Sequence, residues 1–389
     1  MEFTIKSEKF EKLKPKFIEI SNYIKDWIND RKPVLIKHHN DCDGHSAGIA
    51  MEMAILPLIK KNGGYTNKSY KRAVSRTPFY DYSDALRDVD SFAYFSQSPL
   101  VIVLDHGSTK ESILSLNKLK ENGAKIIIID HHNPSKKEEG SNEVEDYVDL
   151  FLNPHTSGFG SEIVTGMLCT ELARFINSNI EIPKQIPALS GTADKSNCDE
   201  YDIYLKNSGF DKAYLEKWAM CIDFESFYVR NYNSNAVRDM FEENERTKNS
   251  IEMISKVVEN RFKMLLPTLH KYSETTNING INYSEIHLFK FSQRSYFPTT
   301  SKVTSYFHKK IEGPKITLGI LDDSISFRLG DVKYLTLHLL ISYLKEKLPY
   351  AQIDGGGHIF AGTIRFAKGA KEDVLEESKK FIKDKNYIK

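Results

Sequence analysis

The chain has few cysteines and lacks several features that would place it in a class at once. Only four cysteines occur among 389 residues, without metal-type spacing, which argues against a disulfide framework and a thiolate metal site. No apolar run approaches the ~18–20 residues that span a bilayer, and the charged N-terminus lacks the apolar core of a secretory signal. We therefore expect reduced thiols, a cytoplasmic location and no membrane partner.

The chain also lacks an excess of charge of one sign. Lys+Arg total 54 and Asp+Glu total 53, so net charge does not favour a nucleic-acid partner, although a local basic face is compatible with this balance. The hydrophobic content of 40% and charged content of 28% are ordinary for a globular protein. Seven of the 12 histidines fall in four short motifs, and this clustering indicates metal or phosphate chemistry.

The first of these motifs follows four isoleucines at residues 126–129 and reads Asp130, His131, His132. A short β-branched run bounded by turn residues is typical of a buried strand in a parallel sheet. Ligands of such sheets bind outside the carboxyl ends of the strands, so the acid and both imidazoles are candidates for a site. The alternative is that Asp130 caps a helix and the histidines are incidental.

A second motif follows another predicted strand and combines histidines with two acids. Residues 33–36 predict this short strand, and the polar residues after it are His38, His39, Asp41 and Asp43. Asp41 and Asp43 can project to one side of an extended segment, where two carboxylates repel each other unless a cation lies between them. Gly44 is expected to make the turn into a buried helix over residues 46–56 that Pro57 ends or kinks. The alternative is a solvated Asp-rich loop.

The same layout of strand, acid and helix occurs a third time. Residues 100–104 (LVIVL) predict a buried strand that runs into Asp105 and His106. A further acid, Asp194, follows small residues at 190–193, where a helix N-cap is the alternative reading. Strands alternating with helices predict a doubly wound parallel sheet, and three strands delivering acids and histidines to one edge predict one shared site.

The second half of the chain has a different character. Residues 236–264 are highly charged, with apolar residues on one helical face, and predict a helix that connects two domains. We therefore expect a catalytic domain over 1–235, a connecting segment over 236–272 and a smaller α/β substrate-binding domain over 273–389, with the active-site cleft between the domains.

A glycine-rich stretch in the C-terminal part is the other chemical motif. Gly355, Gly356 and Gly357 precede His358, and we expect a loop there whose backbone N–H groups approach an anion such as phosphate. Arg328 on a preceding hairpin is a natural bidentate phosphate partner. A plain turn and an ordinary surface arginine are the alternatives.

Five motifs in this order resemble the DHH phosphoesterase superfamily and its associated substrate-binding domain, over roughly residues 30–370. They are HHNDCDG, VIVLDHGS, IIIIDHHNP, GTAD, and GGGH followed by AG. The HHNDCDG motif is similar to the H-x-D-x-D-G run of archaeal RecJ-like nucleases. The resemblance implies a site for two metal ions, usually manganese, with magnesium as the other candidate.

The resemblance also implies a role for each matching residue. One ion would be held by His39, Asp41 and Asp105. The other would be held by Asp43, Asp105, His131 and Asp194, with Asp105 as the bridge. His132 would face the scissile phosphate, and Asp130 would support the histidines. The substrate's phosphates and terminal nucleotide would be gripped by Gly355, Gly356, Gly357, His358 and Arg328. His38 is open as a ligand in place of His39.

The function implied is a manganese-dependent exonuclease on single-stranded DNA or RNA, in DNA repair, with a helicase or a replication or repair factor as a candidate partner. Tyr296 and Phe297 are candidates for stacking bases. One alternative is a small-substrate enzyme: an oligoribonuclease, a cyclic dinucleotide phosphodiesterase or a 3′-phosphoadenosine phosphatase. The other is a nucleic-acid or replisome scaffold that does not cut. A monomer and a dimer are both compatible with the sequence.

Overall fold

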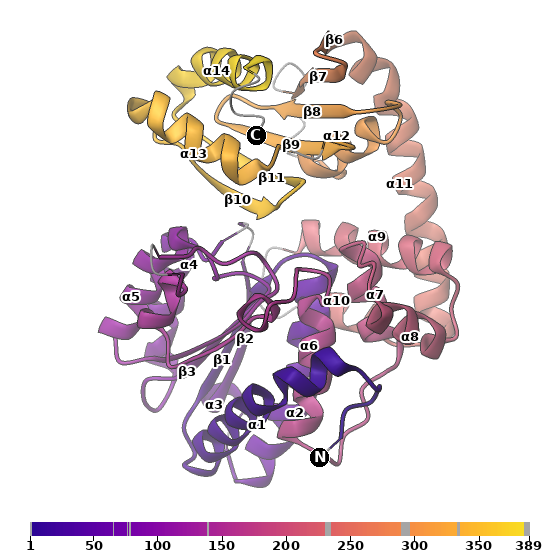
Figure 1. Cartoon of the computed structure of the whole chain (residues 1–389). Helices are drawn as coiled ribbons and strands as arrows, with labels where there is room; N and C mark the ends of the chain where they lie inside the picture. The colour runs from indigo at the N-terminus through magenta and orange to yellow at the C-terminus, as the bar shows by residue number, and fades with distance from the viewer. Residues whose placement is uncertain are drawn as a thin grey trace. The chain divides into compact units, whose positions relative to one another are not determined.

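The chain divides into two compact units, Met1–Ser255 and Lys256–Lys389 (Figure 1). The computed structural model describes residues 2–64, 66–75, 77, 79–137, 140–229, 235–288, 296–332 and 335–384. The boundary falls inside one continuous helix, α11 (Glu245–Lys271), within the segment expected to connect the domains. No helix in the described ranges combines the length and apolarity needed to cross a membrane.

The first unit is built on a parallel sheet. The chain's polar motifs follow its strands and therefore lie along one edge of the sheet. Its strands are β1 (Val34–His39), β2 (Tyr70–Ser75), β3 (Leu100–Leu104), β4 (Lys125–Ile129) and β5 (Leu150–Leu152). They pair in the order β2-β1-β3-β4-β5, with every pair parallel. This confirms the doubly wound sheet. The order reverses between β1 and β3, and such a switch point is where open sheets of this kind bind ligands.

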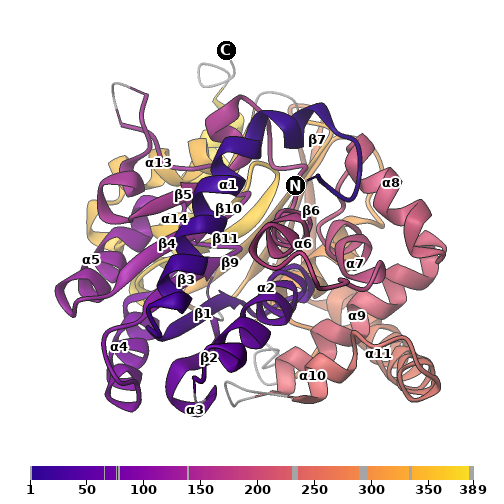
Figure 2. The same ribbon diagram turned by 90° about the horizontal axis from the view of Figure 1, so that it is seen from below.

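Helices cover both faces of this sheet. The helices of the first unit that precede α11 are α1 (Glu8–Asn29), α2 (Cys42–Lys61), α3 (Thr66–Ser69), α4 (Tyr82–Ser91), α5 (Ile113–Glu121), α6 (Thr165–Ile176), α7 (Gln185–Ala193), α8 (Asp199–Ser208), α9 (Lys212–Tyr228) and α10 (Asn235–Asp239). Seen from below, α4 and α5 lie on one face, and α1, α2 and α6 on the other (Figure 2). Fully buried Leu35, Val101 and Ile128 pack with Leu116 and Leu119 of α5, which explains the long apolar strand sequences.

The start of α2 differs from the sequence prediction. Asp41 is the N-cap of α2, and its side chain accepts a hydrogen bond from the N–H of Gly44. Gly44 therefore lies in the first helical turn and not in a turn before the helix. A Cβ at this position would lie 2.2 Å from the His39 carbonyl oxygen, so only glycine lets the helix start this close to β1. Pro57 lies inside α2, which continues to Lys61.

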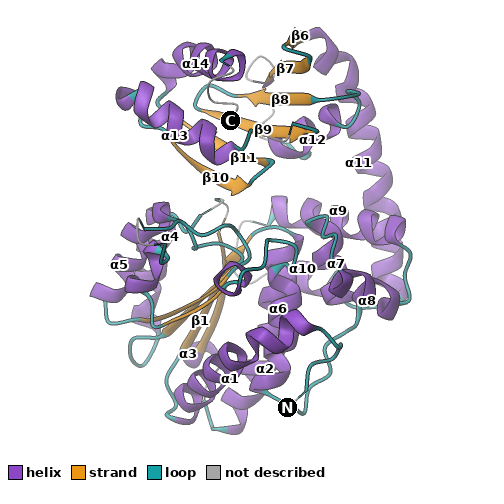
Figure 3. Cartoon of the chain, viewed as in Figure 1, coloured by secondary structure: helices purple, strands orange, loops and turns teal. Residues whose placement is uncertain are grey.

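The second unit is built on a mixed sheet of six strands (Figure 3). Its strands are β6 (Ser273–Ile278), β7 (Ile281–His287), β8 (Lys315–Ile320), β9 (Ser324–Gly330), β10 (Asp354–His358) and β11 (Ala361–Arg365). The order is β10-β11-β9-β8-β7-β6, with all pairs antiparallel except β7–β8. The glycine-rich stretch expected to be a loop is therefore an edge strand, β10, which is a correction.

Besides the end of α11, whose Leu269 packs with Ile286 of β7, the second unit has three more helices among its described residues. They are α12 (Thr300–His308), α13 (Leu337–Lys347) and α14 (Lys371–Lys383). Phe327 and Leu318 pack in one apolar cluster with residues of α13 and α14. Arg328, whose side chain points to the opposite face because it is the next residue along the strand, bonds to α12.

Candidate metal centre

One group of possible ligands gathers after β1 and β3. The Nδ1 of His39 lies 2.7 Å from Asp41 Oδ2 and 3.7 Å from Asp105 Oδ2. The ligand atoms of these three residues all lie within 4.8 Å of one another, which is close enough to surround a single ion.

A second group shares Asp105 with the first. The Nε2 of His131 lies 3.2 Å from Asp194 Oδ2, 3.4 Å from Asp105 Oδ1 and 3.7 Å from Asp43 Oδ2. These four residues also offer ligand atoms within 4.8 Å of one another. The fold thus brings together all six residues predicted as metal ligands, and Asp105 directs one carboxylate oxygen to each group.

Asp105 has an uncommon backbone conformation. It directly follows β3 and has φ 62°, in the left-handed region that non-glycine residues rarely adopt, and its side chain is buried. Its Oδ1 accepts a hydrogen bond from the Thr165 hydroxyl at 3.3 Å. Strained backbone of this kind clusters at functional sites, where the surrounding structure holds it in place.

Asp43 lies in the first turn of α2. The sequence had suggested an extended segment at this position, and that prediction was wrong. It accepts hydrogen bonds at the start of α6, from the N–H of Thr165 at 3.1 Å and of Gly166 at 2.8 Å. The Ser190 hydroxyl donates a third bond at 2.5 Å. Burial, followed by the charges of nearby carboxylates, raises the pKa of Asp43 well above its usual value. A bound cation would remove this repulsion, so the donor set fits a metal ion.

His39 and His38 point to opposite sides of β1, which separates their roles. The Nδ1 of His38 lies 2.7 Å from the His39 carbonyl oxygen, and its Nε2 lies 3.0 Å from Arg72 Nη1. Because a carbonyl only accepts and a guanidinium only donates, both ring nitrogens of His38 are occupied. The Cδ2 of this ring also packs against Gly48 of α2. The structure therefore brings His39, and not His38, to the carboxylates.

His131 is oriented by a backbone carbonyl. Its Nδ1 lies 2.8 Å from the carbonyl oxygen of Ser161, so Nδ1 carries the proton and Nε2 faces the acids. This pattern is usual for a metal-binding imidazole. Burial opposes protonation, but hydrogen bonds to Asp105 and Asp194 raise the pKa of His131 well above its usual value.

Asp130 holds His132 and its backbone. One oxygen, Oδ1, accepts from the N–H of His131 at 2.8 Å, from the N–H of His132 at 3.1 Å, and from His132 Nδ1 at 2.7 Å. The other accepts from the N–H of Ser108 at 3.1 Å. Although burial alone would raise it, the charge and hydrogen bond of His132 lower the pKa of Asp130 below its usual value. Asp130 therefore caps its own turn and also orients the imidazole.

The fourth acid, Asp194, is not a helix N-cap. It is the C-cap of α7, and its carboxylate reaches His131 from outside the sheet. The alternative reading of Asp194 as an N-cap was therefore wrong.

Sequence reasoning did not single out the polar residues that support these side chains. Asn153 donates to the Ser108 hydroxyl at 3.1 Å and to the His132 carbonyl at 2.9 Å, tying two of the strand ends together. Asn153 directly follows β5, so the layout of strand and polar residue that identified the acids could have found it. Ser161 and Ser190 have no such signal, because they act through chain segments distant in sequence.

The second unit carries the remaining predicted residues. Ala361 lies opposite His358 in β10 and opposite Arg328 in β9, so these three side chains share one face of the sheet. The Arg328 guanidinium donates to Ser305 Oγ at 2.7 Å and to the Ser301 carbonyl at 3.1 Å. Arg328 is thus held by α12, and its contact with substrate phosphate stays a prediction.

The three glycines of β10 differ in what surrounds them. A Cβ at Gly355 would lie 2.4 Å from the Thr363 carbonyl, and one at Gly357 would lie 2.6 Å from the Ala361 carbonyl. A Cβ at Gly356 would meet no atom within 4 Å. Packing explains the first two glycines. Gly356, two residues from His358 and on the same face, borders open space.

The aromatic pair suggested for base stacking is split by the structure. Tyr296 is 65% exposed, whereas Phe297 is 1% exposed and its carbonyl accepts a hydrogen bond from Arg261. Phe297 therefore belongs to the packed interior of the second unit and cannot stack on a base.

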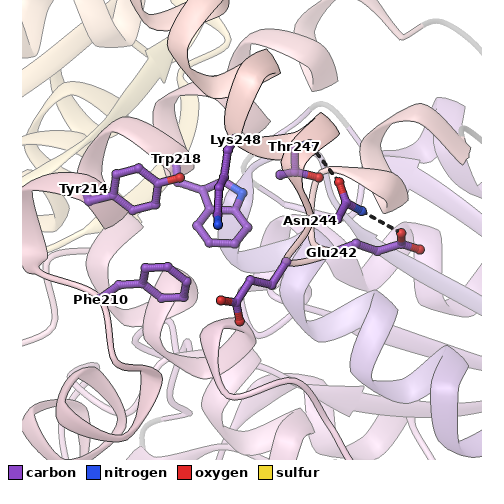
Figure 4. Close-up of a pocket in the computed structure, with 8 residues that line it drawn as sticks. Phe210, Tyr214, Trp218, Glu242, Asn244, Thr247 and Lys248 are labelled. Atoms are coloured by element: carbon purple, nitrogen blue, oxygen red, sulfur yellow. Dashed lines mark hydrogen bonds between the residues drawn. The ribbon is translucent and has the colours of Figure 1, made fainter.

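A shallow surface depression lies elsewhere in the first unit (Figure 4). Phe210, Tyr214 and Trp218 line one side, and a polar segment including Glu242 and Asn244 lines the other. The Trp218 indole donates to the Met240 carbonyl at 2.6 Å, which fixes this segment against α9. None of the groups of possible metal ligands among the described residues includes a residue of this depression.

Comparisons with known proteins agree with this architecture. The family described as "DHH family, N-terminal domain" matches residues 33–191. An uncharacterized protein of Methanocaldococcus jannaschii is 33% identical, and the alignment covers 98% of this chain and 56% of that protein. The chain thus spans little more than half the length of this curated relative.

Solved structures show the same fold. A structure described as the DHH domain of a member of a family of ribosomal proteins has a TM-score of 0.90 at 33% identity, covering 99% of this chain and 94% of that chain. RecJ from Thermus thermophilus in complex with Mn²⁺ has a TM-score of 0.63 at 13% identity, covering 94% of this chain and 54% of that chain, a likeness of fold alone. The chain belongs to the DHH family.

Proposed function

We propose that the protein is a manganese-dependent phosphodiesterase that acts as a RecJ-like exonuclease on single-stranded DNA or RNA. The observation that carries the proposal is that two ligand groups share Asp105, one with His39 and Asp41 and one with three further residues. Two ions bound by these residues would supply an activated water and stabilise the charge that develops on phosphate oxygens. Mixed imidazole and carboxylate ligands suit manganese. The fold is shared with the exonuclease RecJ, which has a crystal structure with bound manganese.

We assign the remaining polar residues of the first unit to positioning the substrate. Asp130 holds the Nδ1 proton of His132 and so leaves Nε2 to meet the scissile phosphate. The buried backbone bonds of Asp130 fix the imidazole before substrate arrives, which lowers the cost of orienting it during reaction. In this proposal the metal centre belongs to the domain at 1–235.

We assign substrate binding to the domain at 273–389. The open space over Gly356 lets a phosphate approach the backbone, and His358 on the same face supplies a hydrogen-bond donor. Arg328 adds a fixed positive charge in the same row of the sheet. A helicase or a replication or repair factor would supply single strands to such an enzyme.

A small-substrate phosphoesterase is the second candidate. The near balance of 54 basic and 53 acidic residues favours it, because proteins that bind long strands usually carry a basic stripe. A scaffold that does not cut is disfavoured, because all six candidate ligands are present and gathered.

The deciding experiment is cleavage of single-stranded 20-mers of DNA and RNA, labelled at either end, in the presence of Mn²⁺. The control is Asp105→Asn, which removes one ligand charge. A ladder from one end, absent in the control, supports the exonuclease and gives its polarity. Turnover of dinucleotides without cleavage of 20-mers favours the small-substrate enzyme. No turnover of either substrate by the metal-loaded protein overturns the proposed activity.

A further inference from the structure

The turn between β10 and β11 displays two adjacent apolar side chains. Ile359 and Phe360 form the tip of this hairpin, between the paired residues His358 and Ala361. Ile359 is 36% exposed and Phe360 is 54% exposed. Single exposed apolar residues are common and need no explanation, but these two are consecutive and follow the glycine-rich strand directly.

The backbone of this turn is anchored on both sides. The Ile359 carbonyl accepts a hydrogen bond from the N–H of Leu337 at 2.9 Å, at the start of α13. The Phe360 carbonyl accepts one from the N–H of Leu329 at 2.9 Å, in β9. The tip is therefore tied to a helix and to a neighbouring strand, so its backbone has little further entropy to lose on binding.

The surroundings of Phe360 combine an aromatic face with groups that suit an anion. His358 lies two residues away, and two residues of extended chain span at most ~7 Å. Arg328 lies in the same row of the sheet as His358, one strand beyond Ala361. Gly356 borders open space on that face. A flat apolar side chain two residues from an imidazole matches a nucleotide, in which one sugar joins a phosphate to a planar base.

We propose that Phe360 is a binding residue on which a nucleobase of the substrate stacks while the attached phosphate lies toward His358 and Gly356. The inference rests on the proposed function and deepens it, because it requires substrates that contain bases. Stacking on an aromatic side chain tolerates any sequence, since every base has a π face. Ile359 extends the apolar surface beside the ring.

The test uses the full-length protein and single-stranded oligonucleotides with 2-aminopurine at one end or the other. Stacking on the protein quenches the fluorescence of this base analogue. We compare Phe360→Ala with Phe360→Tyr, which keeps the ring, and with Tyr350→Ala. Tyr350 is a matched control because it is 60% exposed and belongs to the second unit, but lies outside the hairpin. Thermal unfolding verifies that each variant is folded.

The expected result is quenching by the wild type, Phe360→Tyr and Tyr350→Ala, with loss of quenching and roughly tenfold weaker binding for Phe360→Ala. An oligonucleotide whose terminal nucleotides are abasic should bind Phe360→Ala and wild type equally. Equal binding of the base-containing strand by both proteins overturns the proposal. So does an oligomer of the wild type that Phe360→Ala disrupts without changing nucleotide binding, because the turn would then contact a second copy.

The two proposals fail in different ways. Cleavage of 20-mers with no effect of Phe360→Ala leaves the exonuclease standing and overturns base stacking. Quenching that depends on Phe360, without cleavage of any substrate, supports base stacking and overturns the catalytic proposal.

Discussion

At the scale of single residues, the left-handed backbone of Asp105 separates its structural role from its chemical one. With φ at 62°, this position favours Asp, Asn or Gly over other residues. Asp105→Asn should therefore fold normally but lose metal, because an amide carries no charge. We expect activity to fall by more than about 100-fold, since losing even the partners of metal ligands costs 10–100-fold. Metal content by mass spectrometry checks the cause.

Asp105→Ala is the comparison for this prediction. It removes the same charge but also places an unfavourable residue at a positive φ, which costs on the order of 1–2 kcal/mol. Equal thermal stability of the Ala and Asn variants would contradict the role of backbone conformation at this position.

Gly44 and Gly356 predict opposite consequences of one added methyl group. A Cβ at Gly44 would lie 2.2 Å from the His39 carbonyl oxygen. Gly44→Ala should therefore destabilise the protein by about 3 kcal/mol in urea unfolding, because the end of β1 must shift. A change below ~0.5 kcal/mol would show that the helix start adjusts freely.

Gly356→Ala should leave the stability unchanged, because its Cβ would meet no atom within 4 Å. If substrate phosphate lies over Gly356, the same methyl group should raise KM severalfold with little change in kcat. Steady-state kinetics on a short oligonucleotide measures both constants. An unchanged KM would place the phosphate elsewhere.

At the scale of elements, a buried network ties the edge strand β2 to β1 and α2. Arg72 donates to Glu52 Oε2 at 3.0 Å and to His38 Nε2 at 3.0 Å. Glu52 also accepts from Tyr70 at 2.9 Å and from Arg238 at 2.9 Å. His38 in turn holds the carbonyl of His39, so the network lies directly behind a candidate ligand.

Arg72→Met should destabilise the protein by about 2 kcal/mol, because it removes one of the two arginines that pair with the buried carboxylate of Glu52 and leaves only Arg238. Adding Glu52→Gln should recover part of this loss, because a neutral amide is less costly to bury. Chemical unfolding of both single variants and the double variant measures the coupling. Purely additive losses would argue against a direct interaction.

The buried strands that lead into the candidate ligands were predictable from the sequence, and the glycine-containing segments were not. The range 100–104 coincides with β3 because a continuous β-branched run has few other stable arrangements. Gly44 reads as a turn residue until the contact with His39 is known, and Gly356 reads as a loop residue until strand pairing supplies partners. The contact at Gly44 depends on backbone geometry, and the pairing at Gly356 depends on residues of another strand, so neither can be read from the local sequence.

The candidate ligands followed the same pattern. Asp105 and His131 were found because each follows a predicted strand, and parallel strands bring their carboxyl ends to one edge. The choice between His38 and His39 could not be made from the sequence, because it depends on which face of β1 meets α2. Ser161 acts through its backbone carbonyl, which any residue supplies.

At the scale of the whole molecule, contacts between residues far apart in sequence hold the N-terminal segment to the rest of the first unit. Ser7 donates to Glu200 Oε1 at 2.6 Å, and Lys9 Nζ lies 3.1 Å from Glu200 Oε2. Burial alone would raise the pKa of Glu200, but the bonds from Ser7 and Lys9 lower it below its usual value. The N-terminal segment is thereby fastened to α8.

This contact predicts a pH dependence of stability. A carboxylate whose pKa is lower in the folded protein stabilises it above the unfolded pKa, ~4.3 for Glu. The contribution is lost as the pH falls through the lower folded value. Glu200→Gln should cost about 1 kcal/mol at pH 7, and the difference from wild type should shrink below about pH 4. Urea unfolding across pH 3–7 measures it, and a constant difference would contradict the ionic role.

The backbone at Asp105 also has a consequence for how this gene can change over generations. Asn and Gly are each one nucleotide substitution away from Asp, and both accept a positive φ. A copy released from selection for activity can therefore acquire either residue and still produce a folded protein. Asn or Gly at this position, with every other motif intact, would then mark a copy that folds but has lost a candidate metal ligand.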